Sequence, residues 1–175
     1  FFNEIRIASG GNNDDRFYFD HLVISKGDPA AGVGTSYCGP GAVNSTGGPG
    51  SIIGLGSPSV IANQLSLQAS GLPAASFGFF LTSQAQALVS MPGGSQGDLC
   101  LGGAIGRFVG PGQILNSGAG GSFTLPVDLT QIPQPTGLVA GAVGEVWNFQ
   151  AWHRDSVAGS ATSNFTDGVE ITLTL

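Results

Sequence analysis

Charge is what this sequence has least of. Only 9% of its 175 residues are charged, and one lysine, Lys26, accompanies four arginines. An average soluble domain is about 25% charged, so Ser, Thr, Asn, Gln and Gly must cover most of this surface. Without a basic patch, binding to a phosphate backbone lacks its main driving force. Nucleic acid is therefore excluded as a partner.

Long apolar runs are also missing. No stretch of about 18 uninterrupted apolar residues occurs, so no membrane insertion is expected. The 30 glycines and 10 prolines stand mostly between apolar runs and indicate turns, which argues against long helices. The chain opens on Phe1-Phe2 without a starting Met or a signal peptide. We expect it to be processed, or to be part of a longer polypeptide.

Cysteine occurs only twice, at Cys38 and Cys100. A disulfide between them would close a loop of about 60 residues and stabilise the fold by roughly 4 kcal/mol. Two buried free thiols are the alternative. The scarcity of lysine and the abundance of Ser, Thr, Asn and Gly favour the disulfide and an extracellular protein. The predicted location is secreted, extracellular or at the cell surface.

Strands are expected nearly throughout the chain, because apolar and polar residues alternate in several short segments. Alternation with one polar face is typical of antiparallel sheets that have one side in water. We therefore predict an all-β, antiparallel β-sandwich of Greek-key or jelly-roll type, with an N-terminal strand pair and essentially no helix. The expected core side chains are Leu67, Phe77, Phe79, Leu81, Phe123, Leu125, Trp147, Phe149, Ile171 and Leu173.

The sequence divides into three parts. Residues 1–25 form a predicted strand pair, residues 26–36 a linker, and residues 37–175 the sandwich domain. A two-stranded hairpin alone is marginal in water. Residues 1–25 must therefore pack on the rest of this chain, on an upstream domain, or on a neighbouring molecule.

Two parts of the chain resemble known families. Asn3-Glu4-Ile5-Arg6-Ile7 and the segment from Phe17 to Ser25 look like the closing strands of a concanavalin-A-like (laminin-G-like) jelly roll. A second set of segments is similar to an uncharacterised C-terminal domain of large secreted bacterial proteins of planctomycete type. This resemblance implies a secreted address and a tail position in a longer protein, and it implies no reaction. Its segments are Tyr37-Cys38-Gly39-Pro40, Asn44-Ser45-Thr46-Gly47, Leu99-Cys100-Leu101-Gly102-Gly103, Ile105-Gly106-Arg107-Phe108, Trp147-Asn148-Phe149-Gln150-Ala151-Trp152 and Thr162-Ser163-Asn164-Phe165-Thr166-Asp167-Gly168.

Catalytic arrangements are poorly represented. The two histidines, His21 and His153, come without a Gly-x-Ser-x-Gly elbow. In His153-Arg154-Asp155, adjacent strand residues face opposite sides, so a surface ion pair is the favoured interpretation. The carboxylates show no spacing typical of a glycosidase pair. We predict that the protein is not an enzyme.

Binding sites have better candidates. Asn12, Asp14 and Asp15 offer hard oxygen ligands in one loop, which makes calcium the candidate cofactor, with a polar turn as the alternative. Trp147 and Trp152 are five apart, so regular strand geometry turns them to opposite faces. One belongs to the core, and Trp152, with Tyr18, is the candidate platform for a sugar; core packing is the alternative for every aromatic.

Sheet edges suggest the leading function. A chain that begins and ends with apolar strands can complete a neighbour's sheet by strand addition, and it has almost no lysine to protect such edges. We predict a structural or assembly protein of a surface, matrix or fibre that self-associates or meets a neighbouring domain through its edges. The alternative is a carbohydrate- or surface-binding, lectin-like adhesion module. The residues expected to make the assembly contact are Phe2, Ile5, Ile7, Phe17, Phe19, Leu22 and Ile24.

Overall fold

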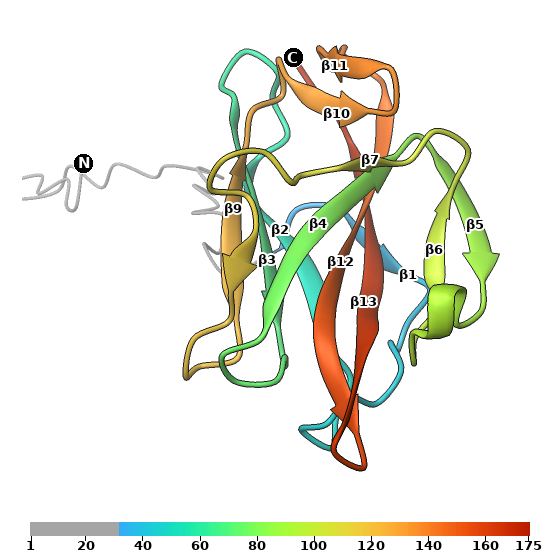
Figure 1. The fold of residues 1–175 in the computed structure, drawn as a ribbon. Helices are drawn as coiled ribbons and strands as arrows, with labels where there is room; N and C mark the ends of the chain where they lie inside the picture. The colour runs from blue at the N-terminus through green and yellow to red at the C-terminus, as the bar shows by residue number, and fades with distance from the viewer. Residues whose placement is uncertain (1–31) are drawn as a thin grey trace, which may run out of the picture.

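A computed structural model describes residues 32–175, and these residues form two packed antiparallel sheets (Figure 1). The prediction of an all-β sandwich is confirmed, whereas the Greek-key or jelly-roll order stays a prediction. The larger sheet has the order β1-β13-β12-β4-β7, with β8 also paired to β4. Its strands are β1 (Thr35–Tyr37), β4 (Phe77–Ser83), β7 (Gly106–Arg107), β8 (Leu115–Asn116), β12 (Val146–Val157) and β13 (Ser160–Thr172).

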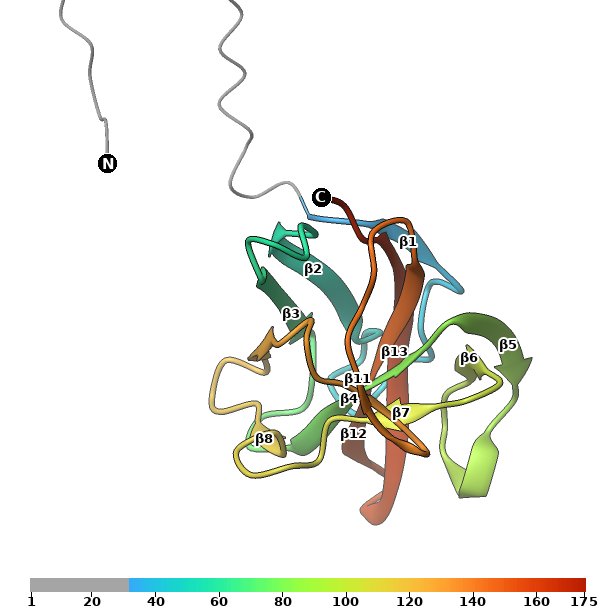
Figure 2. The same cartoon turned by 90° about the horizontal axis from the view of Figure 1, so that it is seen from above.

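The smaller sheet has the order β2-β3-β9, and two hairpins complete the fold. In Figure 1 the smaller sheet and the β5–β6 hairpin lie on opposite sides of β4, β12 and β13, and Figure 2 shows the same separation from above. Within residues 32–175 the one helical element is a 3₁₀ turn, η1 (Pro92–Gly94), between β5 and β6. The remaining strands are β2 (Ser51–Ser57), β3 (Gln64–Ser70), β5 (Ala85–Val89), β6 (Leu99–Gly102), β9 (Phe123–Val127), β10 (Ile132–Gln134) and β11 (Gly137–Val139).

The main core lies between the two sheets, where period-two alternation places it. In β3, Leu65, Leu67 and Ala69 are buried, and in β9, Phe123 and Leu125 are buried between exposed neighbours. The larger sheet and the residue directly after β13 contribute four of the expected core side chains. These are Trp147, Phe149, Ile171 and Leu173, and all are buried. The prediction of the core is therefore confirmed for these strands.

In β4, Leu81 is buried as predicted, but the main core takes Phe80 in place of Phe77 and Phe79. Phe77, Phe79 and Leu81 share the outer face of the larger sheet, while Phe80 points into the main core and is 0% exposed. The ring of Phe80 meets that of Phe123 edge-on, with ring centroids 5.2 Å apart. Gly78 lies on the same inner face, where an added Cβ would come within 2.8 Å of the Phe123 ring.

A second apolar cluster explains why alternation failed in β4. On the outer face, Leu81, Leu101 and Phe165 are buried against each other, and the β5–β6 hairpin supplies part of their cover. Both faces of β4 are therefore apolar around Phe79-Phe80-Leu81. A run of three apolar residues in a strand buried on both faces carries no information about which residue faces the core.

The two ends of the described segment pair within the domain. The main-chain N–H of Val33 donates to the carbonyl of Gly54 at 2.7 Å, and β1 pairs with β13. Val33, Thr35 and Ser36 lie at the C-terminal end of the predicted linker, residues 26–36, and they already form part of the sandwich. The last strand, β13, lies between β1 and β12 and is not an edge. The predicted strand pair, residues 1–25, lies outside the described residues.

The outward and inward positions of β4 can be separated by mutation. We expect Phe80→Ala to lower the free energy of unfolding by about 3–5 kcal/mol, because it empties a buried site. Phe77→Ala, whose side chain is 51% exposed, should cost below about 1 kcal/mol. Urea denaturation of both variants measures the difference, and equal losses would contradict the assigned faces.

Candidate functional site

The two tryptophans lie on opposite faces of β12, as their spacing predicts. Trp147 is 1% exposed in the main core, and its indole N–H donates to Glu145 at 3.0 Å. Trp152 is half-buried on the outer face, where its ring lies 5.0 Å from that of Phe79, with the planes tilted by 31°. β12 keeps its alternation between them because the extra residue of the local β-bulge belongs to β13.

A groove of about 380 Å³ opens beside this aromatic pair on the outer face. Its volume falls within the range of small-molecule sites, which are mostly apolar with few polar groups. Buried Leu81 and Phe165 form its floor, and Arg107 at its rim is the single charged residue that lines it. The complete lining consists of Phe79, Leu81, Pro92, Gly93, Leu99, Ile105, Arg107, Trp152 and Phe165.

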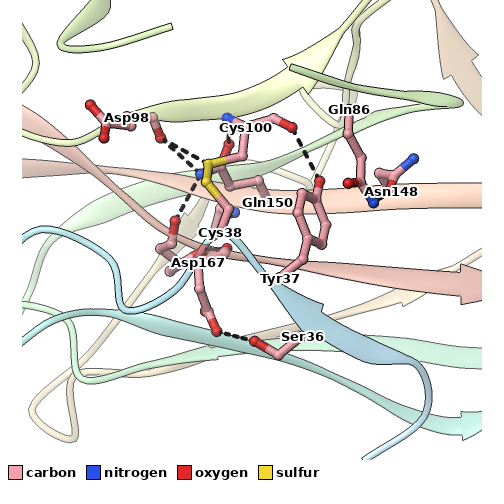
Figure 3. Close-up of a disulfide and its surroundings, with 11 residues drawn as sticks. Ser36, Tyr37, Cys38, Gln86, Asp98, Cys100, Asn148, Gln150 and Asp167 are labelled. Carbon is pink, nitrogen blue, oxygen red and sulfur yellow. Dashed lines mark hydrogen bonds between the residues drawn. A yellow bond between two sulfur atoms is a disulfide. The ribbon is translucent and has the colours of Figure 1, made fainter. Parts of the chain in front are cut away.

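One buried amide holds the β6 wall of the groove on the sheet (Figure 3). The Gln150 carbonyl oxygen accepts the main-chain N–H of Cys100 at 2.9 Å, and its NH₂ group donates to the carbonyls of Asp98 and Thr166 at 2.9 and 2.8 Å. Gln150 is 0% exposed, so these bonds satisfy an amide that would otherwise be costly to bury.

The predicted disulfide between Cys38 and Cys100 is present and joins the end of β1 to β6. The Tyr37 hydroxyl donates to the Cys100 carbonyl at 3.3 Å beside it. Burial, with a smaller contribution from the charge of Glu170, raises the pKa of Tyr37 far above its usual range, so the phenol stays a neutral donor. A disulfide also indicates an oxidising compartment outside the cytoplasm.

Asp167 connects β13 to both neighbouring segments on this side. One carboxylate oxygen accepts the Ser36 hydroxyl and the other accepts the main-chain N–H of Ile52, both at 2.8 Å. The short β1 is thereby fixed to β13 by a side-chain bond as well as by strand pairing, and through the disulfide it anchors the hairpin that forms the groove wall. The wall is therefore preformed.

Beyond Trp152 the outer face continues to Phe77 and Arg154. These two residues line a shallower depression of about 220 Å³, and the exposed ring of Phe77 stands next to Phe79 on the same strand face. Arg154 follows Trp152 at the next outward position of β12. Together Phe77, Phe79, Trp152, Arg107 and Arg154 make up a surface that we call the aromatic strip.

His153 and Asp155 do not form the surface ion pair that the sequence suggested. His153 is 0% exposed, and its Nδ1 lies 3.1 Å from the Arg154 carbonyl, which assigns the ring proton to Nδ1. Burial lowers the pKa of His153 below its usual value, and the Arg154 carbonyl and Asp155 only partly oppose this shift. Alternation along the strand correctly places Arg154 on the face opposite His153 and Asp155. It does not predict that the face carrying His153 and Asp155 is buried.

Asp155 is used for structure. Burial alone would raise its pKa, but hydrogen bonds from Ser45, Ser156 and Asn164 outweigh burial and hold the pKa of this carboxyl below its usual range. The N–H groups of Ser45 and Ser156 lie 3.0 and 2.8 Å from its Oδ1. The carboxylate therefore ties the loop around Ser45 to the β12–β13 hairpin.

Several predicted site residues fall outside the described part of the chain. These are the candidate calcium ligands Asn12, Asp14 and Asp15, the platform Tyr18, and the assembly residues Phe2, Ile5, Ile7, Phe17, Phe19, Leu22 and Ile24. Among residues 32–175, no group of three or more His, Cys, Asp or Glu side chains could hold a metal ion. Within the same residues, no helix is long and apolar enough to cross a membrane.

Trp152 is the predicted site residue that the fold places in a groove, and its partners were missed. The alternation in β4 predicts a core position for Phe79, and no motif in the sequence marks Arg107 as a site residue. The one available signal was the run Phe79-Phe80-Leu81, which is too apolar for a strand with one wet face.

The chain matches no protein-family model, no curated protein and no solved structure. Its function is therefore argued from the groove itself.

The buried imidazole predicts a loss of stability in mild acid. As the pH falls below about 6.5, the unfolded chain binds a proton at residue 153 while the folded protein, with its lowered pKa, does not. The free energy of unfolding should decrease there by up to about 1.4 kcal/mol per pH unit. His153→Asn keeps a donor for the Arg154 carbonyl but cannot titrate, and it should lack this slope. Identical slopes in urea denaturation between about pH 7 and about pH 5 would contradict the assignment.

The disulfide should matter for both stability and the groove. We expect the double variant Cys38→Ser, Cys100→Ser to lose about 4 kcal/mol of unfolding free energy, since its unfolded chain regains the entropy of an open loop. Chemical reduction of the unmodified protein provides the matched control and should produce the same loss. A loss below about 1 kcal/mol by urea denaturation would contradict the stabilisation assigned to the bridge.

Proposed function

We propose that this protein is a non-enzymatic binding module, secreted to the cell surface or matrix, that holds carbohydrate in the groove beside Trp152. The observation that carries this proposal is the half-buried Phe79–Trp152 pair on the outer sheet face, in a groove with Arg107 at its rim. The disulfide and the low charge support the secreted location.

The position of the groove favours a sugar over an extended peptide. β4 pairs with β12 on one side and with β7 and β8 on the other, so its backbone is already hydrogen-bonded. A peptide that binds by strand addition needs free backbone groups at a sheet edge. A sugar ring instead offers its apolar C–H face to an aromatic side chain, and Trp152 and Phe79 present such rings.

Assembly through sheet edges is the second proposal, and the alternating apolar residues of positions 1–25 support it. The described residues offer little for this contact. β9 carries Pro126, which has no N–H to donate to an added strand, and β1, β7 and β8 have two or three residues each. The longer edge strand β2 is partly covered, because its Gly54 carbonyl accepts the Val33 N–H and its Ile52 N–H donates to Asp167. If this protein forms fibres, the contact therefore involves residues outside 32–175 or a surface other than these edges.

The proposed function predicts that Trp152→Ala abolishes carbohydrate binding while the domain remains folded. Truncation of a stacking aromatic in a binding site removes about 2 kcal/mol or more, which is about a thirtyfold loss of affinity. Ile61→Ala between β2 and β3, whose side chain is 76% exposed and lines neither the groove nor the other pocket beside Arg107, is the matched control and should bind normally. A glycan array combined with thermal unfolding checks both points. Equal glycan binding by Trp152→Ala and the unmodified protein would contradict the proposal that the groove is the carbohydrate-binding site.

A further inference from the structure

The described part of the chain places all of its positive charge on one face. Residues 32–175 contain two basic side chains, Arg107 and Arg154, against six carboxylates. Arg107 is the register partner of Leu81, and Arg154 follows His153, the partner of Gly78. Cross-strand partners share a face of a sheet, so both arginines belong to the outer face with the aromatic strip.

The two arginines lie at opposite ends of the aromatic strip. Arg107 neighbours position 81 of β4, and Arg154 neighbours position 77 on the other side of the same strand. Four residues of strand separate these positions, which is about 13 Å along β4. Phe79 and Trp152 lie between them. A ligand that reaches both guanidinium groups must be extended and must present an apolar face in between.

The groove itself contains no carboxylate, although Arg107 also lines a neighbouring pocket with Asp128, and Arg154 lines the shallower depression with Asp155. Asp155 adjoins Arg154 in sequence, but it is 8% exposed and its oxygens accept hydrogen bonds from Ser45, Ser156 and Asn164. On a chain with a net charge of −6, an anion is repelled by most of the surface and attracted here.

We infer that the aromatic strip binds an acidic polysaccharide, whose anionic groups pair with Arg107 and Arg154 while its sugar rings stack on Phe79 and Trp152. The inference rests on the proposed carbohydrate function and deepens it by naming the ligand class. Charge complementarity selects an anion, and the span between the arginines selects a polymer. Guanidinium groups suit this role because their planar donors match carboxylate and sulfate oxygens.

Two matched pairs of polymers test the charge directly. Polygalacturonate is compared with its methyl ester, and dextran sulfate with dextran, by affinity electrophoresis and calorimetry with the complete chain. We expect at least one anionic polymer to bind about tenfold more tightly than its neutral counterpart, and to weaken about tenfold from about 50 to about 300 mM NaCl. Arg107→Gln and Arg154→Gln should each reduce this preference, and Arg107→Lys, which keeps the charge, should retain most of it.

The outcomes separate the inference from the function on which it rests. If the neutral polymers bind as tightly as the anionic ones and Trp152→Ala abolishes both, the acidic ligand is wrong and the carbohydrate function stands. If polyglutamate binds as well as the anionic polysaccharides, the ligand is an acidic peptide and the inference is overturned. If neither these polymers nor any glycan on an array binds, the proposed function fails as well.

Discussion

The groove depends on how the β5–β6 hairpin is held against the larger sheet. A sheet of this kind usually leaves its outer face to water, whereas here Leu81, Leu101 and Phe165 are buried on it. Gln150 stabilises this arrangement, because its buried side chain makes two hydrogen bonds to the hairpin, at Asp98 and Cys100, and a third to Thr166 of the neighbouring β13. The disulfide then fixes β6 to β1. Because the hairpin covers only part of the outer face, Phe79 and Trp152 remain accessible in the groove beside it.

The sequence predicted the class of fold and most of the core, for a reason that can be stated. In β3, in β9 and in the last residues of β13 one face is apolar and the other meets water or polar side chains, so the period of two reports burial directly. The two cysteines and the spacing of the tryptophans carried similar local information. Each of these predictions depends on residues near one another in sequence, or on one covalent pair.

The missed features depend on contacts between distant segments. The outward direction of Phe79 follows from the hairpin that covers β4, and the burial of His153 follows from its packing beside Gly50. Arg107 and Arg154 are 47 positions apart, and only the order β7-β4-β12 brings them to one face. The family resemblances could not predict these contacts either, because they imply a secreted location and a type of fold but no ligand-binding residues.

The central claim is that an acidic polysaccharide binds in the groove beside Trp152. The second tryptophan, Trp147, provides an internal reference for testing it. The indole N–H signals of Trp147 and Trp152 can be followed in a ¹⁵N-labelled sample while oligogalacturonate is added. Our account predicts that the Trp152 signal shifts with the ligand, while the signal of Trp147, 1% exposed in the main core, stays in place. Binding that leaves the Trp152 signal unmoved would contradict the account, because the ligand would then occupy a surface other than the groove.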